Sequence, residues 1–461
     1  MCNKKLPKSN ALMTISFETF ADELTYDALP GAVLAILRRS FIDTMGVAAV
    51  GSTTPLSKIV RRVAPMLFGS GTVGASRMLM DGTKISPAGA AMAGAFTIDS
   101  IDAHDGTTPC KGHAGSAIFP SMIAMAQATD KDIDGKCFAE ILALAYEISY
   151  RAGLVQHETC QDYHTSGAWT AVGVASAGVR LLGGNREQIR QAAGIGEYHG
   201  PRSQMMRCID HPSMVRDGVG WGAPSGVTAA YLALEGFTGA PALTCEGAEG
   251  RHFWADLGTG WRLVEHTHYK AYPCCRWSHP AIDAVHDIMQ ENTLTHQMVK
   301  AVEIRTFHYA TRLAGHEPKS QDEFAYSIAF PVAAMIVRGQ VGVSELTQEA
   351  LCDPDILRVS RATTLIDDTE MTRISTDKRW AKVSLLLEDG RQIESAPRTP
   401  RGDADMPLTD KEILTKFHSL ADPILGVSIA NEIEALSSQF DTLSAKDFQH
   451  LLDLCTSKVQ D

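Results

Sequence analysis

Apolar residues recur every three to four positions through most of the first half of the chain, which is the period of an amphipathic α-helix. Alanine and glycine are frequent among them and suit helices that pack closely on one another, whereas a strand-rich core favours valine, isoleucine and aromatic residues. The pattern predicts a bundle of α-helices. The predicted helices cover residues 32–50, 121–129, 137–155, 170–182 and 222–234, with Gly236 at the C-cap of the last one.

From about residue 266 the pattern changes. Residues 302–308 alternate between apolar and polar positions, and residues 382–394 form two alternating runs around Asp389 and Gly390. Aspartate followed by glycine between such runs is a strong signal for a β-hairpin. The change of period predicts a smaller domain that contains strands.

Helical stretches at residues 280–290 and 324–337 lie between the predicted strands, so this smaller domain is expected to be α+β. Residues 397–407 are expected to form a linker. Beyond it, residues 409–454 are helical again and either return to the first domain or cap it. A length of 461 residues also exceeds one ordinary core and suggests two or three domains.

Composition is typical of a soluble globular protein, and the net charge is the one compositional feature that bears on possible partners. Hydrophobic residues make up 44% of the chain and charged residues 21%, which excludes disordered and collagen-like classes, and the formal net charge is -12. Because phosphate binding requires a basic face, we expect no nucleic acid partner. An anionic substrate would need a pocket that is locally basic.

The sequence carries no sign of a membrane segment or of disulfides. No run reaches the roughly 20 apolar residues that span a bilayer, and the N-terminus has lysines but no apolar signal core. We therefore expect no membrane partner and a cytoplasmic location. The ten cysteines form no CxxC pair or disulfide framework, so we expect reduced thiols.

The densest candidate chemistry is the run DAHDGTTPCKGH, which places two carboxylates (Asp102 and Asp105) and two imidazoles (His104 and His113) close together. Such groups are costly to bury without partners, so a chain concentrates them where chemistry or binding uses them. We predict one wall of an active site. Metal ligation is an alternative, but no second His/Asp group follows at metal-motif spacing, and general acid–base chemistry fits better.

Basic and histidine residues follow in two loop-like stretches. His164, in DYHTSGAW, precedes a helix whose free N–H groups favour an anion, although a surface histidine near a cap explains it equally well. Arg202, Arg207 and Arg216 either clamp carboxylates through their guanidinium forks or lie in solvent.

The segment KAYPCCRWSHPAID lies at the predicted domain junction, where ligand clefts are common, and carries Lys270, Tyr272, Arg276 and His279. Either of its two cysteines would need a lowered thiol pKa to act as a nucleophile, and a buried thiol is the better interpretation. A GxGxxG at residues 69–74 follows a helical stretch instead of a strand, so we expect a turn and not a dinucleotide site.

Seven motifs, in order along most of the chain, resemble the MmgE/PrpD family, which includes 2-methylcitrate dehydratase, cis-aconitate decarboxylase and iminodisuccinate epimerase. They are FIDTMGVAAVGS with Asp43 and Gly46, DAHDG followed by GHAGSAIFP, YHTSGAWTAVG, MVRDGVGWGAPSGVTAAYLALEGFTG, residues 270–284, DEFAYSIAFPVAA, and PRGDADMPLTDKEILTKF. The resemblance implies a mainly α fold with a large all-helical domain from both chain ends (1–265 with 400–461) and an inserted α+β domain (266–399). It also implies a homodimer and no cofactor or metal.

The resemblance further implies that Asp102 or Asp105, His113, His164, residue 216 and His279 line the pocket. The chain departs from the family pattern at two positions, with Ala114 where members often have proline and Arg216 where many have lysine. Arginine stays charged, so it can clamp a carboxylate but cannot shuttle a proton.

The family's reactions all make or break a bond beside a carboxylate, which implies one pocket for a small di- or tricarboxylic acid. We expect a histidine paired with an aspartate to move the proton and cations to hold the carboxylates. The expected catalytic residues are Asp102, Asp105, His113, His164 and His279. The expected substrate-binding residues are His104, Arg202, Arg216, Lys270 and Tyr272.

Among these reactions, dehydration of a hydroxy polycarboxylate is the first expectation, decarboxylation of a cis-aconitate-like acid the second, and epimerisation the third. Two other classes stay open. Arg216 and Ala114 motivate a binding paralogue without catalysis, and the Asp/His run motivates a metal-dependent hydrolase.

Overall fold

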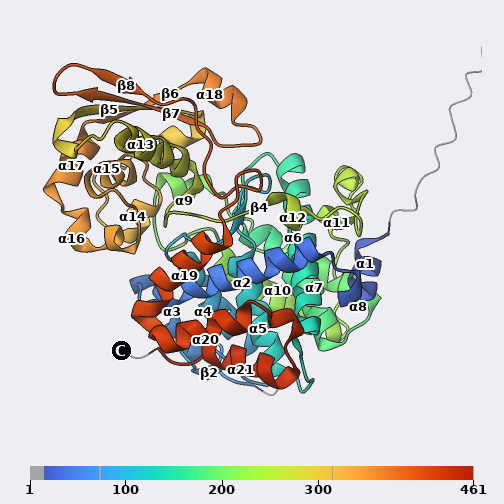
Figure 1. Ribbon diagram of the computed structural model, residues 1–461. Helices are drawn as coiled ribbons and strands as arrows, with labels where there is room; N and C mark the ends of the chain where they lie inside the picture. The colour runs from blue at the N-terminus through green and yellow to red at the C-terminus, as the bar shows by residue number, and fades with distance from the viewer. Residues whose placement is uncertain (1–14, 72–73, 314, 460–461) are drawn as a thin grey trace, which may run out of the picture.

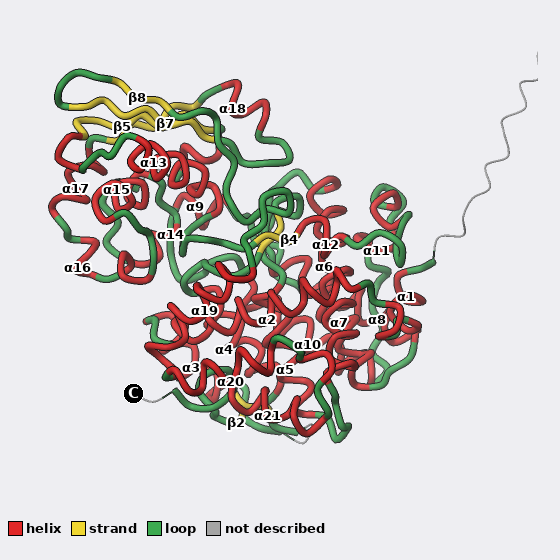
Figure 2. Tube along the Cα trace, in the orientation of Figure 1, coloured by secondary structure: helices red, strands yellow, loops and turns green. Residues whose placement is uncertain are grey.

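The computed structural model describes residues 15–71, 74–313 and 315–459, most of which lie in helices (Figures 1 and 2). The first helices are α1 (Phe17–Glu23), α2 (Gly31–Gly51), α3 (Pro55–Leu67), α4 (Pro87–Asp99), α5 (Gly115–Ala128), α6 (Gly135–Thr159), α7 (Gly167–Leu182), α8 (Arg186–His199), α9 (Met206–Asp210), α10 (Val219–Leu234), α11 (Leu243–Glu246) and α12 (Arg262–His266). The later helices are α13 (His279–Glu291), α14 (Gln321–Ala325), α15 (Ala329–Arg338), α16 (Gln348–Leu351), α17 (Pro354–Arg361), α18 (Thr369–Ile374), α19 (Asp410–Leu425), α20 (Val427–Ser437) and α21 (Ala445–Cys455). The strands are β1 (Ser76–Arg77), β2 (Lys84–Ile85), β3 (Gly106–Thr107), β4 (Thr267–His268), β5 (Val299–Thr306), β6 (Thr363–Asp367), β7 (Ala381–Leu387) and β8 (Gln392–Glu394).

The predicted mainly helical character is confirmed, and the five helices predicted in the first half are α2, α5, α6, α7 and α10. Helices α6 and α7 are buried along most of their length, which their alanine and glycine residues permit because small side chains let backbones approach. Gly236 follows α10 with a φ of 88°, the left-handed conformation of a helix end.

The C-terminal helices α19 to α21 lie among the first helices, where α19 packs along α2 (Figure 1). Lys416 on α19 donates to Asp43 on α2, with 2.7 Å between Nζ and Oδ1. A Cβ at Gly46 would lie 3.2 Å from the Cα of Phe417, so glycine permits this close approach. The segment 409–454 is helical as expected but is divided into three helices. The division of the chain into two domains stays a prediction.

One four-stranded sheet occupies the other end of the molecule, with the strand order β6-β5-β7-β8 and helices α13, α15 and α17 packed against it (Figure 1). Strands β5 and β6 are parallel and the other pairs antiparallel. The predicted hairpin is confirmed as β7 and β8, with Gly390 in the turn at a φ of 88°. The stretch 324–337 is not one helix, because the backbone leaves the helical conformation between α14 and α15.

Two ladders of two residues each, β1–β2 and β3–β4, place strands in and beside the helical part, so residues 1–265 are not strictly all-helical. Of the GxGxxG, Gly71 and Gly74 form an isolated bridge after α3, and the two residues between them, where the turn was predicted, lie outside the described residues. In the described residues, no helix combines the length and hydropathy needed to cross a membrane. The nine described cysteines are free thiols, as expected.

Candidate active site

A two-residue ladder brings the run from Asp102 to His113 against the segment that carries Lys270. Strand β3 pairs antiparallel with β4, and Gly106 lies opposite His268. A Cβ at Gly106 would lie 2.6 Å from His268 Nε2 and 2.9 Å from His113 Nδ1, so glycine lets both rings approach the strand. The ladder thus joins two segments that are far apart in the sequence.

Asp102 and Lys270 form a buried ion pair at the centre of the site. Lys270 Nζ donates to Asp102 Oδ1, and both residues are buried. The carboxylate supplies the counter-charge that a buried ammonium requires. Asp102 has a φ of 52°, a left-handed conformation that is uncommon outside glycine and is often found at functional sites.

His113 presents one ring nitrogen to the same cluster. Its Nδ1 lies 3.2 Å from the backbone carbonyl of Asp105, which can only accept, so Nδ1 carries the proton and Nε2 has the lone pair. Nε2 lies 3.8 Å from Asp102 Oδ1 and 3.8 Å from Asp217 Oδ2. Burial, and then the Lys270 ammonium, lowers the pKa of His113 to about 3. The imidazole is therefore neutral at neutral pH and placed to accept a proton.

Two further acids extend the cluster. Ser166 donates to Asp217 through its N–H at 3.2 Å and through its hydroxyl, and the Asp217 N–H donates to Asp99 Oδ2 at 3.2 Å. Burial, and then the Asp99 charge, holds the pKa of Asp217 well above its usual range. Burial, and then the Asp102 charge, raises the pKa of Asp99 to about 6. These shifts favour a protonated Asp217 beside His113.

Arg216 lies behind the cluster and joins it to α14. Its Nη2 lies 2.9 Å from Asp322 Oδ1 and also donates to the Ser100 carbonyl, and its guanidinium lies 6.0 Å from the centre of the Tyr326 ring. Nε and Nη1 are buried and have no hydrogen-bond partner among the described residues. Nη2 is already engaged, so Nε and Nη1 remain as two separate donors for an incoming acceptor.

A small cavity opens beside His113. It is lined by Asp102, Thr107, Thr108, Lys111, Gly112, His113, Tyr163, Met205, Ile209, His268, Cys275, Arg276, Trp277, Tyr326 and Arg379. The space open to the centre of a water molecule is about 40 Å³, and an adjoining outer cavity of about 440 Å³ shares four of the lining residues. Burial raises the pKa of Cys275 to about 12, so its side chain is a protonated thiol and not a ready nucleophile. This agrees with the interpretation from the sequence.

His104 and Asp105 are buried next to the cluster but do not line the cavity. Asp105 accepts from the Tyr146 hydroxyl at 2.6 Å and from the Gly115 N–H at 3.2 Å, and burial raises the pKa of Asp105 to about 6. The His104 ring lies 4.7 Å from that of His113, and burial followed by the His113 charge lowers the pKa of His104 far below its usual range.

Three residues of the run offer a set of metal-ligand atoms. One atom each of Asp102, His104 and His113 lie within 4.8 Å of one another. Asp102 Oδ1 already accepts from Lys270, so a metal ion bound through this oxygen would compete with the ammonium.

Besides Lys270, which pairs with Asp102, two predicted residues of the KAYPCCRWSHPAID segment lie outside the lining. His279 Nε2 donates to the Cys274 carbonyl at 3.1 Å, and its Nδ1 lies 3.3 Å from Arg276 Nη1, so the ring supports a residue that does line the cavity. Tyr272 donates to Asp283 at 2.7 Å and faces a different cavity.

Two further predicted residues lie near the surface. His164 is half-buried and bridges Gln204 through the backbone, and Arg202 is exposed with its Nη2 3.0 Å from Cys160 Sγ. Neither lines the cavity.

Sequence reasoning missed several residues that do line the cavity or bond to its acids. Asp217 directly follows Arg216, and His268 precedes Lys270 by two positions, so both could have been found as titratable neighbours of predicted residues. Ser166, Tyr326 and Arg379 carry no such signal, because only the folded chain brings them to the site.

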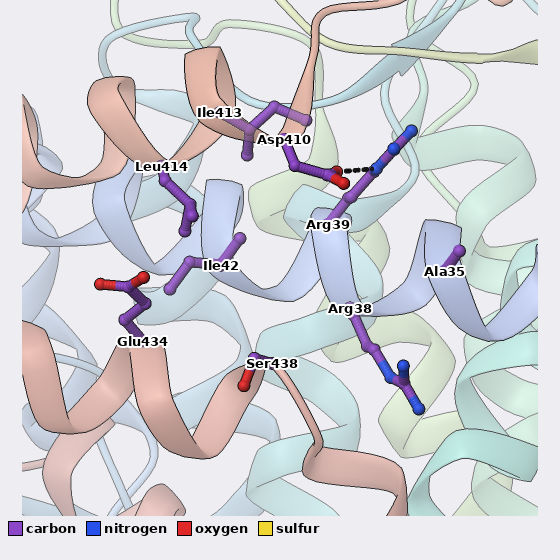
Figure 3. A pocket seen from close by; sticks show the side chains of 9 residues that line it. All are labelled: Ala35, Arg38, Arg39, Ile42, Asp410, Ile413, Leu414, Glu434 and Ser438. Atoms are coloured by element: carbon purple, nitrogen blue, oxygen red, sulfur yellow. Dashed lines mark hydrogen bonds and ion pairs between the residues drawn. The ribbon is translucent and has the colours of Figure 1, made fainter.

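A second hollow lies between α2, α19 and α20 and shares no lining residue with the cavity beside His113 (Figure 3). Arg39 donates to Asp410 there at 2.6 Å, and Ile42, Ile413 and Leu414 form its apolar wall. Its lining residues include no cluster of acids and imidazoles comparable to that around His113.

Two family models match the chain, the MmgE/PrpD N-terminal domain over residues 16–261 and the MmgE/PrpD C-terminal domain over residues 272–442. The chain is 24% identical over 492 aligned residues to a cis-aconitate decarboxylase of Aspergillus terreus, with 99% of each chain covered. It is 22% identical to a cis-aconitate decarboxylase of Homo sapiens, over 90% of this chain and 88% of that one. It is also 20% identical to a cis-aconitate decarboxylase-like protein of Aspergillus oryzae, over 98% of each chain. Because these two family models together match most of the chain, the chain belongs to the MmgE/PrpD family.

Proposed function

We propose that the protein is a cofactor-independent lyase that acts beside a carboxylate of a small di- or tricarboxylic acid. The observation that carries this proposal is the neutral His113, whose unprotonated Nε2 faces the cavity between two carboxyl groups and near a buried lysine. A positioned base of this kind moves protons, and nearby cations stabilise the negative charge that forms on the substrate.

Decarboxylation of a cis-aconitate-like acid is the first candidate reaction, because the three relatives described above carry that activity in their names. In such a reaction the carbon–carboxylate bond breaks, carbon dioxide leaves, and the electron pair stays on the substrate carbon until a proton is added. The Asp217 carboxyl, whose raised pKa favours its protonated form, would supply that proton through His113 Nε2, 3.8 Å away. Lys270 would offset the developing charge.

Dehydration of a hydroxy polycarboxylate is the second candidate. It requires one group to remove a proton and another to protonate the departing hydroxyl. The Asp217 carboxyl, whose pKa is raised by burial and by Asp99, lies 3.8 Å from His113 Nε2 and supplies such a second group. The same pair would serve epimerisation, the third reaction.

In this proposal His279 positions Arg276, and Asp105 holds the His113 ring through its backbone carbonyl. Arg216 offers an unpartnered donor, Nε or Nη1, to a substrate carboxylate.

The test is to incubate the purified protein with cis-aconitate, citrate and 2-methylcitrate and to follow carbon dioxide release and the absorbance of unsaturated products. Carbon dioxide from cis-aconitate supports decarboxylation, and a rise in absorbance with a hydroxy acid supports dehydration. No turnover of any of the three would overturn both candidates and favour a binding paralogue.

A further inference from the structure

Two cations lie at the mouth of the cavity. Lys111 lies between β3 and α5, and Arg379 lies between α18 and β7, and both line the inner and the outer cavity. Arg379 donates through Nη1 to the carbonyls of Ser375 and Lys378, each at 3.2 Å. Within the described residues neither side chain forms an ion pair, and neither belongs to the acid and histidine cluster.

A row of three aromatic rings connects the two cations. Lys111 Nζ lies 5.7 Å from the centre of the Tyr163 ring, and the guanidinium carbon of Arg379 lies 5.7 Å from that of Phe307. Trp277 lies between them, 6.3 Å from Tyr163 and 5.6 Å from Phe307 between ring centres. The Tyr163 hydroxyl donates to the Lys111 carbonyl at 2.6 Å, which holds this end of the row in place.

The nearby acidic side chains on the cavity walls bond to groups other than Lys111 and Arg379. Arg276 donates to Asp403 at 2.7 Å, Arg312 bonds Asp210, and Asp162 accepts from Gln204 at 3.0 Å. Arg379 is only 7% exposed, and burial lowers its pKa, an effect that Tyr163, Asp403, Cys275 and Asp377 only partly offset. Burial, and then the charge of Arg379, also lowers the pKa of Lys111. Two like charges in a partly buried site are costly unless an anion lies between them.

We propose that Lys111 and Arg379 form an anion subsite that binds a substrate carboxylate away from the reacting carbon. The substrate then extends from His113 along the aromatic row to the mouth, because the inner cavity alone is too small to hold it. This inference rests on the proposed function and narrows the substrate class to acids with a second carboxylate that reaches the mouth.

The experiment compares Lys111→Met and Arg379→Gln with the wild type. The matched control is Arg312→Gln, which removes the same charge from the outer cavity at a residue that already has an acidic partner. Turnover of cis-aconitate gives KM and kcat, and isothermal titration with tricarballylate, a saturated tricarboxylate, measures binding without reaction. A lost charge-assisted hydrogen bond predicts a rise in KM and in the tricarballylate Kd of about 10- to 100-fold, with kcat nearly unchanged.

The outcomes separate the subsite from the proposed function. Weaker binding in both variants but not in Arg312→Gln supports the subsite, and Arg379→Lys should restore part of it. Wild-type turnover with unchanged KM in both variants overturns the subsite and leaves the function standing. Absence of turnover with tricarballylate binding that depends on both residues supports the subsite while the proposed reaction fails. No tricarballylate binding to the wild type overturns the subsite.

Discussion

Lys270, two residues after β4, donates to Asp102, three residues after α4, in an ion pair that is buried on both sides. The pair joins two segments that the β3–β4 ladder holds side by side, and His113 Nε2 lies 3.8 Å from the same carboxylate oxygen. The stability of the fold and the surroundings of the His113 base therefore both depend on the ion pair between Lys270 and Asp102.

A double-mutant cycle should show this dependence. Lys270→Met leaves a buried carboxylate without its cation, and removing one partner of such a pair costs roughly 3–5 kcal/mol. Asp102→Asn keeps a residue type that tolerates the left-handed φ of 52° and leaves the ammonium unpaired. The double variant should regain part of the loss in unfolding free energy, measured by urea denaturation. Strictly additive losses would contradict the coupling of the two residues.

His113 and His164 were both expected to exchange protons, and their different positions make a direct comparison informative. His113→Ala removes the base that faces the cavity and should lower kcat by about 10²- to 10⁴-fold, the usual contribution of general acid–base catalysis. His164→Ala, at a residue outside the lining, should lower kcat much less. Steady-state kinetics on the substrate found in the turnover screen measures both. An equal or larger loss in His164→Ala would assign the proton transfer to that residue.

The regular elements could be predicted because their signals are local. The apolar period of α2, α6, α7 and α10 and the Asp389–Gly390 turn are complete within a few residues of sequence. Strand β6 was missed because its five residues, of which only Thr363 is buried, carry little pattern and their parallel pairing with β5 is non-local. The break between α14 and α15 was missed for the same reason, since helix-forming residues continue across it.

Sequence alone could indicate those candidate-site residues that stand together with other titratable residues in one short segment. Asp102, His113, Lys270 and Arg276 stood out as titratable residues in glycine- and proline-rich runs, and all four meet at or near one cavity. The β3–β4 ladder that brings them together is two residues long and leaves no periodicity in the sequence. Lys111 and Arg379 gave no signal, because an unpaired cation is recognisable only once its neighbours in space are known.

The family resemblance implied lysine as a common residue at the position of Arg216, and exchanging the two residues tests what this position does. Arg216→Met should lower the unfolding free energy by roughly 3–5 kcal/mol, because Asp322 loses its cation. Arg216→Lys keeps the charge but loses the planar guanidinium whose Nη2 contacts both Asp322 and the Ser100 carbonyl, so a smaller loss, about 1–3 kcal/mol, is expected. Thermal unfolding and steady-state kinetics measure both. A higher kcat in Arg216→Lys than in the wild type would show that this position moves a proton, contrary to a clamping role.

The raised pKa of Asp105 predicts that the stability of the protein depends on pH. Its pKa of about 6 in the folded protein lies above the ordinary 3.8, so the folded state holds this proton more tightly than the unfolded state. Stability from this group is therefore complete below about pH 4 and is lost as the pH rises to about 6, by up to roughly 3 kcal/mol. Asp105→Asn cannot ionise, so its melting temperature relative to wild type should rise between about pH 4.5 and pH 7.

The control for this measurement is Asp410→Asn, which removes one carboxylate from an exposed pair with Arg39 on the helical part. Its melting temperature should keep a constant offset from wild type over the same pH range, because an exposed pair is screened by solvent. Since the amide introduced by Asp105→Asn would still accept from either the Tyr146 hydroxyl or the Gly115 N–H, that variant should fold. A constant offset for Asp105→Asn as well would mean that its proton is not held by burial, and the raised pKa would then be wrong.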